Sequence, residues 1–517
     1  MTETPDRVRP GGATGLTELA AEQESRLIKT LRRGDIVFFI VAAVISVDTI
    51  GLMASGGPEG LVWAVFLAGA FLVPSAMIFA ETGGAFTEEG GPYQWVKHAF
   101  GRLWAAIAVV LYWITNPIWL GGSLVFIASE VWNTYVFGIE PGSAGDYIFK
   151  LIFIWAAITL AIVSLRKGKV VISAGAIAKL LVLVSLVATA VIYGFAEGFE
   201  PITMSSLTPT TGGFLAIVPI ALFAYLGFEA PNSAAGEMHN PQKDVPAAIR
   251  RGSIITMLAY VLPVLAILWA TPADEVADAG VLAALERAYS VYGPAAGFLT
   301  VVTALLFVFA LLTQGSAWMM ATDRMQAMAA ADGAFFGGYF GEFHEKLGTP
   351  VRMNILSGVV STIFAIAALT LVEGTAASVF VVVLTVAVST LLISYLLIIP
   401  AVMKLRRDFP DVHRPYRVPG GTTGFYVLAG VVLAFIALGS WVAVFPGTIE
   451  SLFGLEYSFQ DVWGVSQLNF EAFTIGTLIL VILLALVGYW RAGGVRAAAS
   501  RVSSAGGLVA ETTDRGI

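Results

Sequence analysis

Apolar residues form long uninterrupted runs along most of this chain. Twelve runs are long enough, at about 1.5 Å per helical residue, to cross the roughly 30 Å of hydrocarbon in a bilayer. The pattern therefore predicts an all-α integral membrane protein with about twelve transmembrane helices. The runs cover residues 36–56, 60–80, 103–129, 147–165, 170–195, 214–235, 252–270, 290–320, 353–372, 375–402, 424–446 and 471–490.

Positive charges between the runs predict the orientation of the chain. If the spans alternate, 26 of the 29 Lys and Arg residues lie in loops and tails on the side of the amino terminus, whereas Lys150 and Arg287 lie on the other side and Lys179 lies within a span. Cytoplasmic loops carry the excess of such residues. We therefore expect a multi-pass protein of the cytoplasmic (inner or plasma) membrane with both termini in the cytoplasm. Residues 17–33 fit either an amphipathic helix or a disordered tail.

Composition excludes several other classes of protein. Hydrophobic residues make up 57% of the chain and charged residues 13%, which is too little charge to cover a soluble domain. Cysteine is absent, which excludes disulfides, thiol catalysis and zinc-thiolate sites. The four histidines lie in predicted loops without ligand spacing, so we expect neither a metal site nor a cofactor.

Two of the runs contain residues that interrupt a helix. The first, VAAVISVDTIGLMASGGPEGLVWAV, holds Asp48, Gly51 and the Gly-Gly-Pro of 56–58, and the sixth, FAYLGFEAPNSAAGEM, holds Gly227 and Glu229. The two lie five spans apart, as two inverted five-helix repeats would place them. Paired interruptions of this kind indicate a substrate site at the membrane midplane, where freed backbone groups bind a solute. The alternative is that Gly and Pro are simply common in membrane helices.

Three charged residues fall within the predicted spans, where insertion of a charge costs about 3 kcal/mol. Asp48 lies in the first interruption, where it can hold a substrate amine or a cation. Glu229 lies in the sixth, where it can cap freed backbone N–H groups or take part in gating. Lys179, in the fifth span, can supply coupling through its protonation, or can extend to the cytoplasmic face with its stem in lipid.

Several longer segments resemble one superfamily over nearly the whole chain. The segments AETGGAFTEEGGPYQWVKHAFG (80–101), GFEAPNSAAGEMHNPQKDVPAAI (227–249), WMMATDRMQAMAAADGAF (318–335) and GTPVRMN (348–354) are similar to motifs of the amino acid, polyamine and organocation (APC) superfamily. YRVPGG (416–421) is similar to its bacterial glutamate/GABA antiporter branch.

This resemblance implies a LeuT-type fold with spans 1–5 and 6–10 as inverted repeats and discontinuous helices 1 and 6. It also implies sodium-independent uptake or exchange by alternating access. The expected division is a cytoplasmic tail (1–33), a ten-helix core (34–402, with repeats 34–198 and 210–402), helices 11 and 12 (403–490) and a second cytoplasmic tail (491–517).

The resemblance also assigns roles to individual residues. Phe223 falls on the aromatic gate of arginine/agmatine exchangers, Trp318 on an aromatic residue that lines their cavity, and Tyr112 and Asn116 on positions that face it. Lys179 matches a lysine that fills the sodium site in proton-coupled members. The expected substrate-binding set is Ser46, Asp48, Thr49, Ile50, Gly51, Tyr112, Asn116, Phe223, Tyr225, Gly227, Gln314 and Trp318, and the expected coupling or gating residues are Lys179, Glu229 and Phe223.

Two residues depart from the family pattern. Gln314 stands where glutamate/GABA exchangers have a carboxylate, so acid-dependent glutamate/GABA exchange is not expected. Asp48 stands where many members have only small residues. Because a desolvated ammonium needs an anionic partner, Asp48 favours a polyamine, a cationic amino acid or a small alkylamine as the substrate.

These observations predict a secondary transporter for an amino acid, amine or polyamine, proton-coupled and sodium-independent. The expected partners are this small molecule, protons and the bilayer, without nucleic acid; small-residue faces on the last two spans are compatible with a homodimer. An obligate exchanger, a channel and a transporter-fold sensor are the alternatives. An enzyme is not expected, because the spans lack His, Cys and close acid pairs. The sequence also lacks a phosphate-binding GxxxxGK[ST] loop, which argues against ATP-driven transport.

Overall fold

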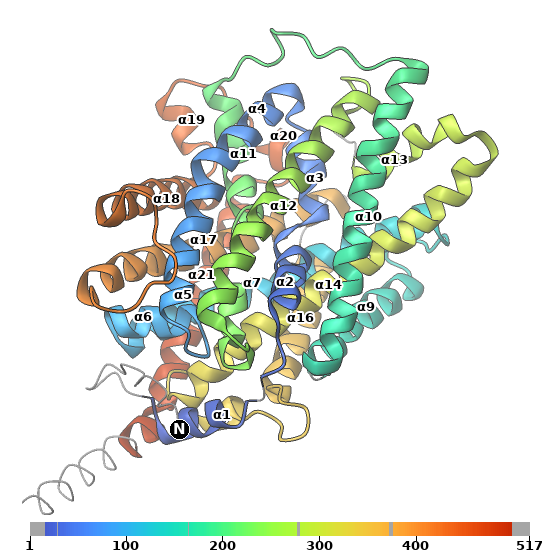
Figure 1. Cartoon of the computed structure of the whole chain (residues 1–517). Coiled ribbons are helices and arrows are strands. Elements are labelled where there is room, and N and C mark those ends of the chain that lie inside the picture. Colours follow the sequence, from blue (N-terminus) through green and yellow to red (C-terminus); the bar gives the residue numbers. More distant parts are fainter. Residues whose placement is uncertain (1–15, 28, 164, 277–279, 372–375, 499–517) are drawn as a thin grey trace, which may run out of the picture.

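The computed structural model describes residues 16–498 except 28, 164, 277–279 and 372–375. Within these residues the protein is helical, and its only β pairing is one isolated bridge between Leu31 and Met238. A bundle of long helices makes up the body of the molecule, and short helices lie at both ends (Figure 1). The prediction of an all-α membrane protein is confirmed.

Ten helices in the described part of the chain are long and apolar enough to cross a membrane. Two of them, α4–α5 and α7–α8, continue through a π-helical turn at Ala68–Leu72 and Leu120–Leu124. In chain order the ten are α4–α5 (Gly57–Ala85), α7–α8 (Arg102–Tyr135), α9 (Ala144–Ile162), α10 (Leu165–Glu197), α12 (Pro241–Ala270), α14 (Ala296–Ala331), α16 (Val351–Leu371), α17 (Ala376–Asp408), α18 (Gly421–Val444) and α21 (Gln467–Arg491).

The first and sixth spans are the interrupted ones, as predicted. The first consists of α2 (Arg33–Val44) and α3 (Val47–Ala54), which meet at an angle of 47°. The sixth consists of α11 (Thr211–Ala224), a non-helical stretch, and the 3₁₀ helix η3 (Ala230–Glu237). With the ten long helices, these two positions account for the twelve predicted spans.

The boundaries of the first two spans differ from the prediction. The interruption lies at residues 45–46, before Asp48, so that Asp48 is in the first turn of α3 and Gly51 is inside this helix. The Gly-Gly-Pro sequence at 56–58 belongs to the turn into α4, where Gly57 has a φ of 63° and Pro58 occupies the first turn. A proline fits there because the first N–H groups of a helix need no partner within it.

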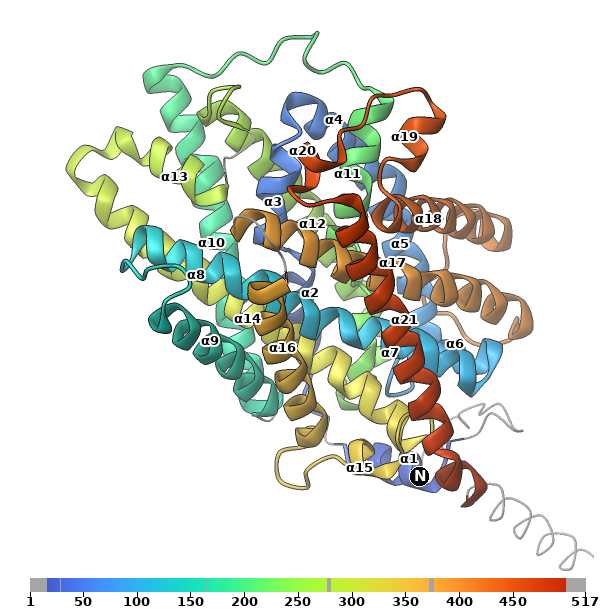
Figure 2. The ribbon, with the colours of Figure 1, turned by 180° about the vertical axis from the view of Figure 1, so that it is seen from behind.

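Burial separates central helices from peripheral ones. In α7–α8 and α17 the most apolar 18-residue window is 83% buried, whereas in α21 it is 28% buried. Helix α21 lies on the outside of the bundle, next to α17 (Figure 2). The central helices are therefore the ones whose polar residues are held away from lipid.

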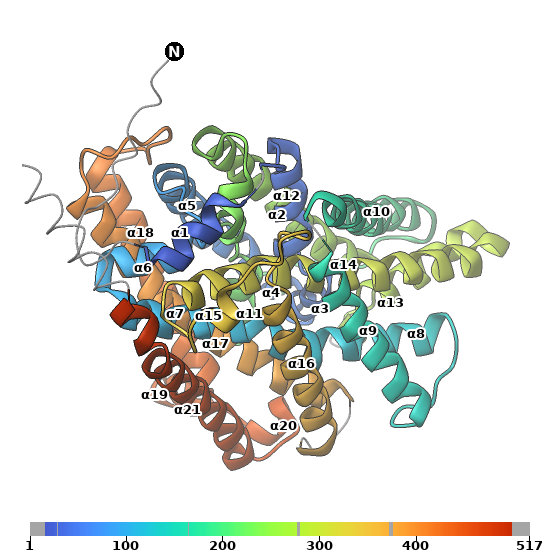
Figure 3. The same ribbon diagram turned by 90° about the horizontal axis from the view of Figure 1, so that it is seen from below.

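Both described termini lie at one end of the bundle, which we call the termini end. Here α1 (Glu18–Ser25) contacts the last turn of α14 and the short helix α15 (Gly338–Gly341), across the bundle (Figure 3). Arg496, after α21, donates to the carbonyl oxygen of Gly333 at the same end. For residues 17–33 the sequence left open a helix or a disordered tail, and the structure has the helix α1 at Glu18–Ser25.

The remaining short helices lie between the long ones. Helix α6 (Pro92–Phe100) precedes α7, and α13 (Val281–Tyr289) with η5 (Ser290–Ala295) precedes α14. Helices α19 (Thr448–Leu452) and α20 (Phe459–Trp463) lie in the connection between α18 and α21. Four of these five were not predicted from the apolar runs, because each is too short to form one, whereas η5 falls at the start of the predicted run 290–320.

Candidate functional site

Side chains from three helices bind the backbone groups freed at the interruption of the first span. The carbonyl oxygens of residues 42–45 lack the helical N–H donors that a continuous helix would give them. Lys179 Nζ donates to those of residues 42 and 45, and Trp318 Nε1 donates to that of residue 43 at 2.8 Å. Tyr260 Oη donates to the oxygen of residue 44 at 3.0 Å and accepts from Ser46 N at 2.7 Å. These bonds offset the cost of the exposed backbone and hold the bend in place.

Asp48 is a buried carboxylate with neutral hydrogen-bond donors. Trp119 Nε1 donates to Asp48 Oδ2 at 3.2 Å, and Gln314 Nε2 donates to Asp48 Oδ1 at 3.3 Å. The residue is 6% exposed and lies in the first turn of α3, where the helix dipole favours a negative charge. A single carboxylate is thus held at the centre of the bundle.

Lys179 faces the interior of the bundle and not the lipid. Its side chain has no exposed surface, and its ammonium donates to two carbonyl oxygens of α2 and, at 2.6 Å, to Gln314 Oε1. An ammonium has three protons to donate, and all three find acceptors here. Extension of Lys179 to the membrane surface, the alternative considered from the sequence, does not occur in this structure.

A narrow cavity of about 10 Å³ lies next to the interruption. This is roughly the room that one water molecule needs, so binding of a larger solute requires the surrounding helices to move apart. Five residues of the predicted set or its neighbours, Ser46, Asn116, Trp119, Phe223 and Trp318, contribute to the walls. The complete lining is Ala43, Val44, Ser46, Thr115, Asn116, Trp119, Phe223, Leu226, Trp318 and Leu391.

The sixth span is interrupted beside the same cavity. Gly227 has a φ of 111°, and a Cβ atom there would lie 2.7 Å from the ring of Trp318, so this position requires glycine for two reasons. Glu229 Oε1 accepts from the hydroxyl groups of Tyr112 in α7 and Tyr395 in α17. The carboxylate thus connects the sixth span with the two central helices.

Other residues of the predicted set lie near the cavity without lining it. Thr49 Oγ1 donates to Ser46 O at 2.9 Å, and Ile50 is fully buried in α3. Tyr225 lies apart from this group, because its hydroxyl donates to Ala64 O and its ring packs edge-on against Tyr260.

Sequence reasoning missed several residues that the structure places at the site. Trp119 follows Asn116 by three residues and Tyr112 by seven, so helical spacing puts all three on one face of α7, and this signal was available. Thr115, three residues after Tyr112, carried the same signal. Tyr395 and Leu391 carried none, because they lie in a long apolar run without an interruption.

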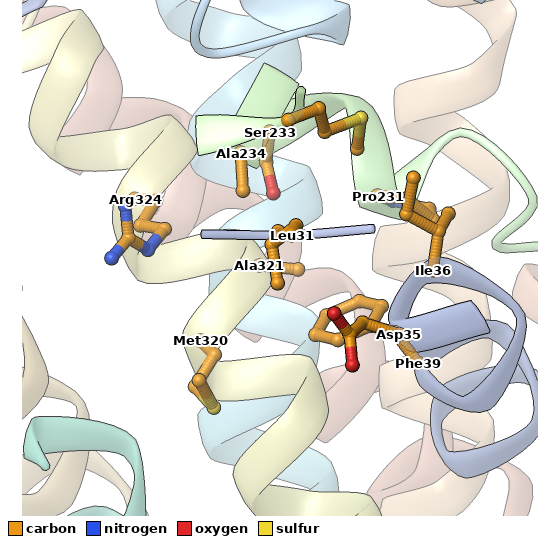
Figure 4. A pocket seen from close by; sticks show the side chains of 11 residues that line it. Leu31, Asp35, Ile36, Phe39, Pro231, Ser233, Ala234, Met320, Ala321 and Arg324 are labelled. Atoms are coloured by element: carbon orange, nitrogen blue, oxygen red, sulfur yellow. The ribbon is translucent and has the colours of Figure 1, made fainter. Parts of the chain in front are cut away.

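A second cavity, of about 20 Å³, lies between the site and the termini end. Leu31, Phe39 and Ala321 are among its walls, and Arg324 points toward its edge (Figure 4). Arg324 also forms ion pairs with Glu237 and, at 3.5 Å, with Glu89. The backbone N–H groups of residues 30 and 31 donate to the carbonyl oxygen of Glu237, so the chain before α2 is tied to the sixth span here.

The whole arrangement, a bundle with two interrupted helices facing a central cavity, has counterparts among known proteins. The sequence profile of the amino acid permease family matches residues 34–450. The chain belongs to this family. As an amino acid permease it is a transporter and not an enzyme, and the resemblance to the APC superfamily is confirmed.

Relatives of this permease match most of its length. A probable agmatine/putrescine antiporter of Lactococcus lactis is 25% identical over 453 residues, which are 87% of this chain and 93% of the relative. An uncharacterised transporter of Legionella pneumophila is 27% identical, covering 88% of this chain and 96% of its own length. A glutamate/gamma-aminobutyrate antiporter of Lactococcus lactis is 22% identical, covering 83% of this chain and 82% of its own length.

Proposed function

We propose that this permease carries a small organic amine, such as a diamine, agmatine or a cationic amino acid, across the cytoplasmic membrane by alternating access between the two ends of the bundle. The observation that carries the proposal is the carboxylate of Asp48, buried beside the cavity and bound there by the neutral donors of Trp119 and Gln314. A buried carboxylate of this kind attracts a cationic group that has left water.

The aromatic walls of the cavity support the same class of substrate. The centres of the Trp119 and Phe223 rings lie 5.9 Å apart at an edge-on angle, and Trp318 also lines the cavity. Aromatic faces attract an ammonium or guanidinium by cation–π interaction, by about 0.5–2 kcal/mol each. The relative named as a probable agmatine/putrescine antiporter supports an amine substrate from the side of the sequence.

Proton coupling, independent of sodium, is the proposed mode of transport. The ammonium of Lys179 lies among the carbonyl oxygens of α2, where it takes up the acceptors that a metal cation would need. Loss and gain of its proton would break and form the contacts that hold α2 to α10. Obligate exchange is a second candidate, which the names of the two antiporter relatives favour.

Uptake into proteoliposomes tests the proposed substrate class. Purified permease would be offered radiolabelled putrescine, agmatine, lysine and glutamate under an inward proton gradient, under an outward one and without a gradient. We expect at least one of the amines to enter well above protein-free liposomes and Asp48→Asn to reduce this uptake at least tenfold. Asp146→Asn, which alters a buried carboxylate that pairs with Lys150 far from the cavity, serves as the control and should retain uptake.

The same vesicles separate the two modes. Accumulation that depends on the gradient and disappears in Lys179→Ala supports proton coupling, whereas flux that requires preloaded amine and ignores the gradient supports exchange. Unchanged amine uptake in Asp48→Asn, or uptake of glutamate alone, would show that the substrate class is wrong.

A further inference from the structure

Gln314 connects Lys179 with Asp48, and its orientation is fixed from both sides. The ammonium of Lys179 can only donate, so it must face the amide oxygen, which it does at 2.6 Å. The amide nitrogen then faces Ser46 Oγ at 2.7 Å and the carboxylate of Asp48 at 3.3 Å. The amide therefore spans the distance between the ammonium of Lys179 and the carboxylate of Asp48.

The charges of this group are balanced only while Lys179 holds its proton. A protonated Lys179 and an ionised Asp48 sum to zero, and one substrate ammonium placed beside Asp48 would add one uncompensated charge there, in a medium of low dielectric constant. Release of one proton from Lys179 to solvent as the amine binds restores the balance. The substrate ammonium and the Lys179 ammonium would thus compete for one negative charge.

We propose that Gln314 is a positioning residue that makes amine binding at Asp48 and proton binding at Lys179 mutually exclusive. This inference rests on the proposed function and adds a direction to it: each bound amine displaces one proton. The amide acts through its two neighbours and need not touch the substrate.

Other titratable groups around Lys179 do not replace Asp48 in this role. Glu229, the other buried carboxylate beside the cavity, accepts from the hydroxyl groups of Tyr112 and Tyr395, whereas Lys179 donates to the backbone of α2 and to Gln314. On α12 the nearest is Tyr260, whose hydroxyl is engaged with the backbone of residues 44 and 46. On α13 it is Tyr289, which bonds to Ser185 and Thr303. Charged residues of α2, α10 and α12 nearer the termini end pair with one another, as Arg33 with Asp244 and Lys169 with Asp35.

The competition predicts a specific pH dependence of binding. If one proton leaves Lys179 for each amine bound, the Kd for putrescine falls about tenfold for each unit of pH as long as Lys179 is protonated in the free protein, because proton and amine binding are linked. Putrescine stays doubly charged below about pH 9, since its amines resemble that of free lysine. Proton release on binding is measured directly in weakly buffered solution.

Two variants of Gln314 test the connection in the full-length purified protein. Gln314→Met keeps the size of the side chain but removes both polar ends, so the slope of log Kd against pH should fall to less than half. Gln314→Glu gives Lys179 a carboxylate of its own, so proton release should disappear. The second variant retains an acceptor for Lys179 and decides the question if the first does not fold.

Gln326→Met is the matched control, since Gln326 is buried in the same helix without a hydrogen-bond partner among the described residues. It should keep the wild-type slope. A slope near one in wild type and control that flattens in both Gln314 variants supports the proposal. Wild-type slopes in both Gln314 variants would overturn this inference, but the proposed amine substrate would stand. An Asp48→Asn protein that binds putrescine normally would overturn the proposed function and this inference with it.

Discussion

Arg324 is buried between the carboxylates of Glu89 and Glu237 at the termini end. One guanidinium cannot balance two negative charges away from water, so one carboxylate is favoured in its protonated form. Burial raises the pKa of Glu89 to about 8; Arg324 acts in the opposite direction, and the charge of Glu237 adds to the increase. Glu89 also accepts from Gly236 N at 2.8 Å, which keeps its carboxyl group in place.

This raised pKa predicts how thermal stability changes with pH. In the unfolded chain Glu89 loses its proton near pH 4.5, whereas in the folded protein it keeps it up to about pH 8. The folded state therefore holds more protons in this window, and its stability falls as the pH rises from about 4.5 through 8. Each pKa unit corresponds to about 1.4 kcal/mol, so the decline amounts to a few kcal/mol.

Melting of the detergent-solubilised protein measured from pH 5 to pH 9 checks this. Glu89→Gln keeps the group uncharged at every pH, and we expect a flatter profile and a higher melting temperature than wild type above pH 8. Glu342→Gln removes an exposed carboxylate that pairs with Arg352 and should leave the profile unchanged. A Glu89→Gln profile that runs parallel to wild type would contradict the assignment.

At the scale of elements, the described residues from Thr17 to Leu31, which include α1, form a strap across the termini end. Thr17 N donates to Asp332 Oδ1 at 2.9 Å and Thr17 Oγ1 to Ala331 O at 2.6 Å, which fixes the start of α1 to α14. At the other end of the strap, Leu31 N donates to Glu237 O at 3.0 Å, and His239 N donates to Leu31 O at 3.1 Å. Because Leu31 lines the second cavity, we expect access to that cavity from this end to require these bonds to break.

Replacement of Leu31 by proline should weaken the strap. Proline has no N–H group, so the bond to Glu237 O is lost, and such a bond contributes about 0.5–1.5 kcal/mol. The chain contains no cysteine, which allows a single reporter thiol to be introduced at Ala321 in the wall of the second cavity. We expect Leu31→Pro to increase the rate of maleimide labelling of Ala321→Cys about two- to tenfold.

The control for this measurement is Lys346→Cys, at an exposed position of the same end, which should be labelled equally fast in both backgrounds. Equal labelling of Ala321→Cys with and without Leu31→Pro would show that the strap does not limit access.

At the scale of the whole molecule, basic side chains gather at the termini end. Lys97 and Arg102 both pair with Asp332, at 2.7 Å and 3.1 Å, and Arg406 and Arg414 both pair with Glu81. The proximity of Lys97 and Arg102 holds the pKa of the Asp332 carboxyl below its usual range even though burial opposes this. The basic residues counted in the sequence are therefore partly structural, since they neutralise buried acids at this end.

Their concentration predicts that the termini end faces the cytoplasm. Fusion of alkaline phosphatase, which is active only outside the cytoplasm, to the carboxyl terminus should give an inactive enzyme, and fusion of a fluorescent protein should give a fluorescent one. A fusion after Met204, between α10 and α11, should show the reverse pattern and serves as the control. Active phosphatase at the carboxyl terminus would invert the orientation.

The sequence by itself determined the twelve helical positions, the two interruptions and three charges within the spans, because apolar length, Gly or Pro within a span and the cost of an inserted charge are all local properties. Asp48, Lys179 and Glu229 could be named for this reason. The sequence also carried the family motifs, which implied Phe223 and Trp318.

Only the tertiary structure decided which groups meet. The link from Lys179 through Gln314 to Asp48 joins residues on three separate helices. Its two hydrogen bonds connect residues that are 135 and 266 positions apart in the sequence. Tyr395 reaches Glu229 from a helix without any interruption, and the freed carbonyl oxygens of α2 find their donors on α10, α12 and α14. Hydrogen bonds in a membrane interior depend on how helices pack around an interruption, and packing is set by the whole bundle and not by any one span.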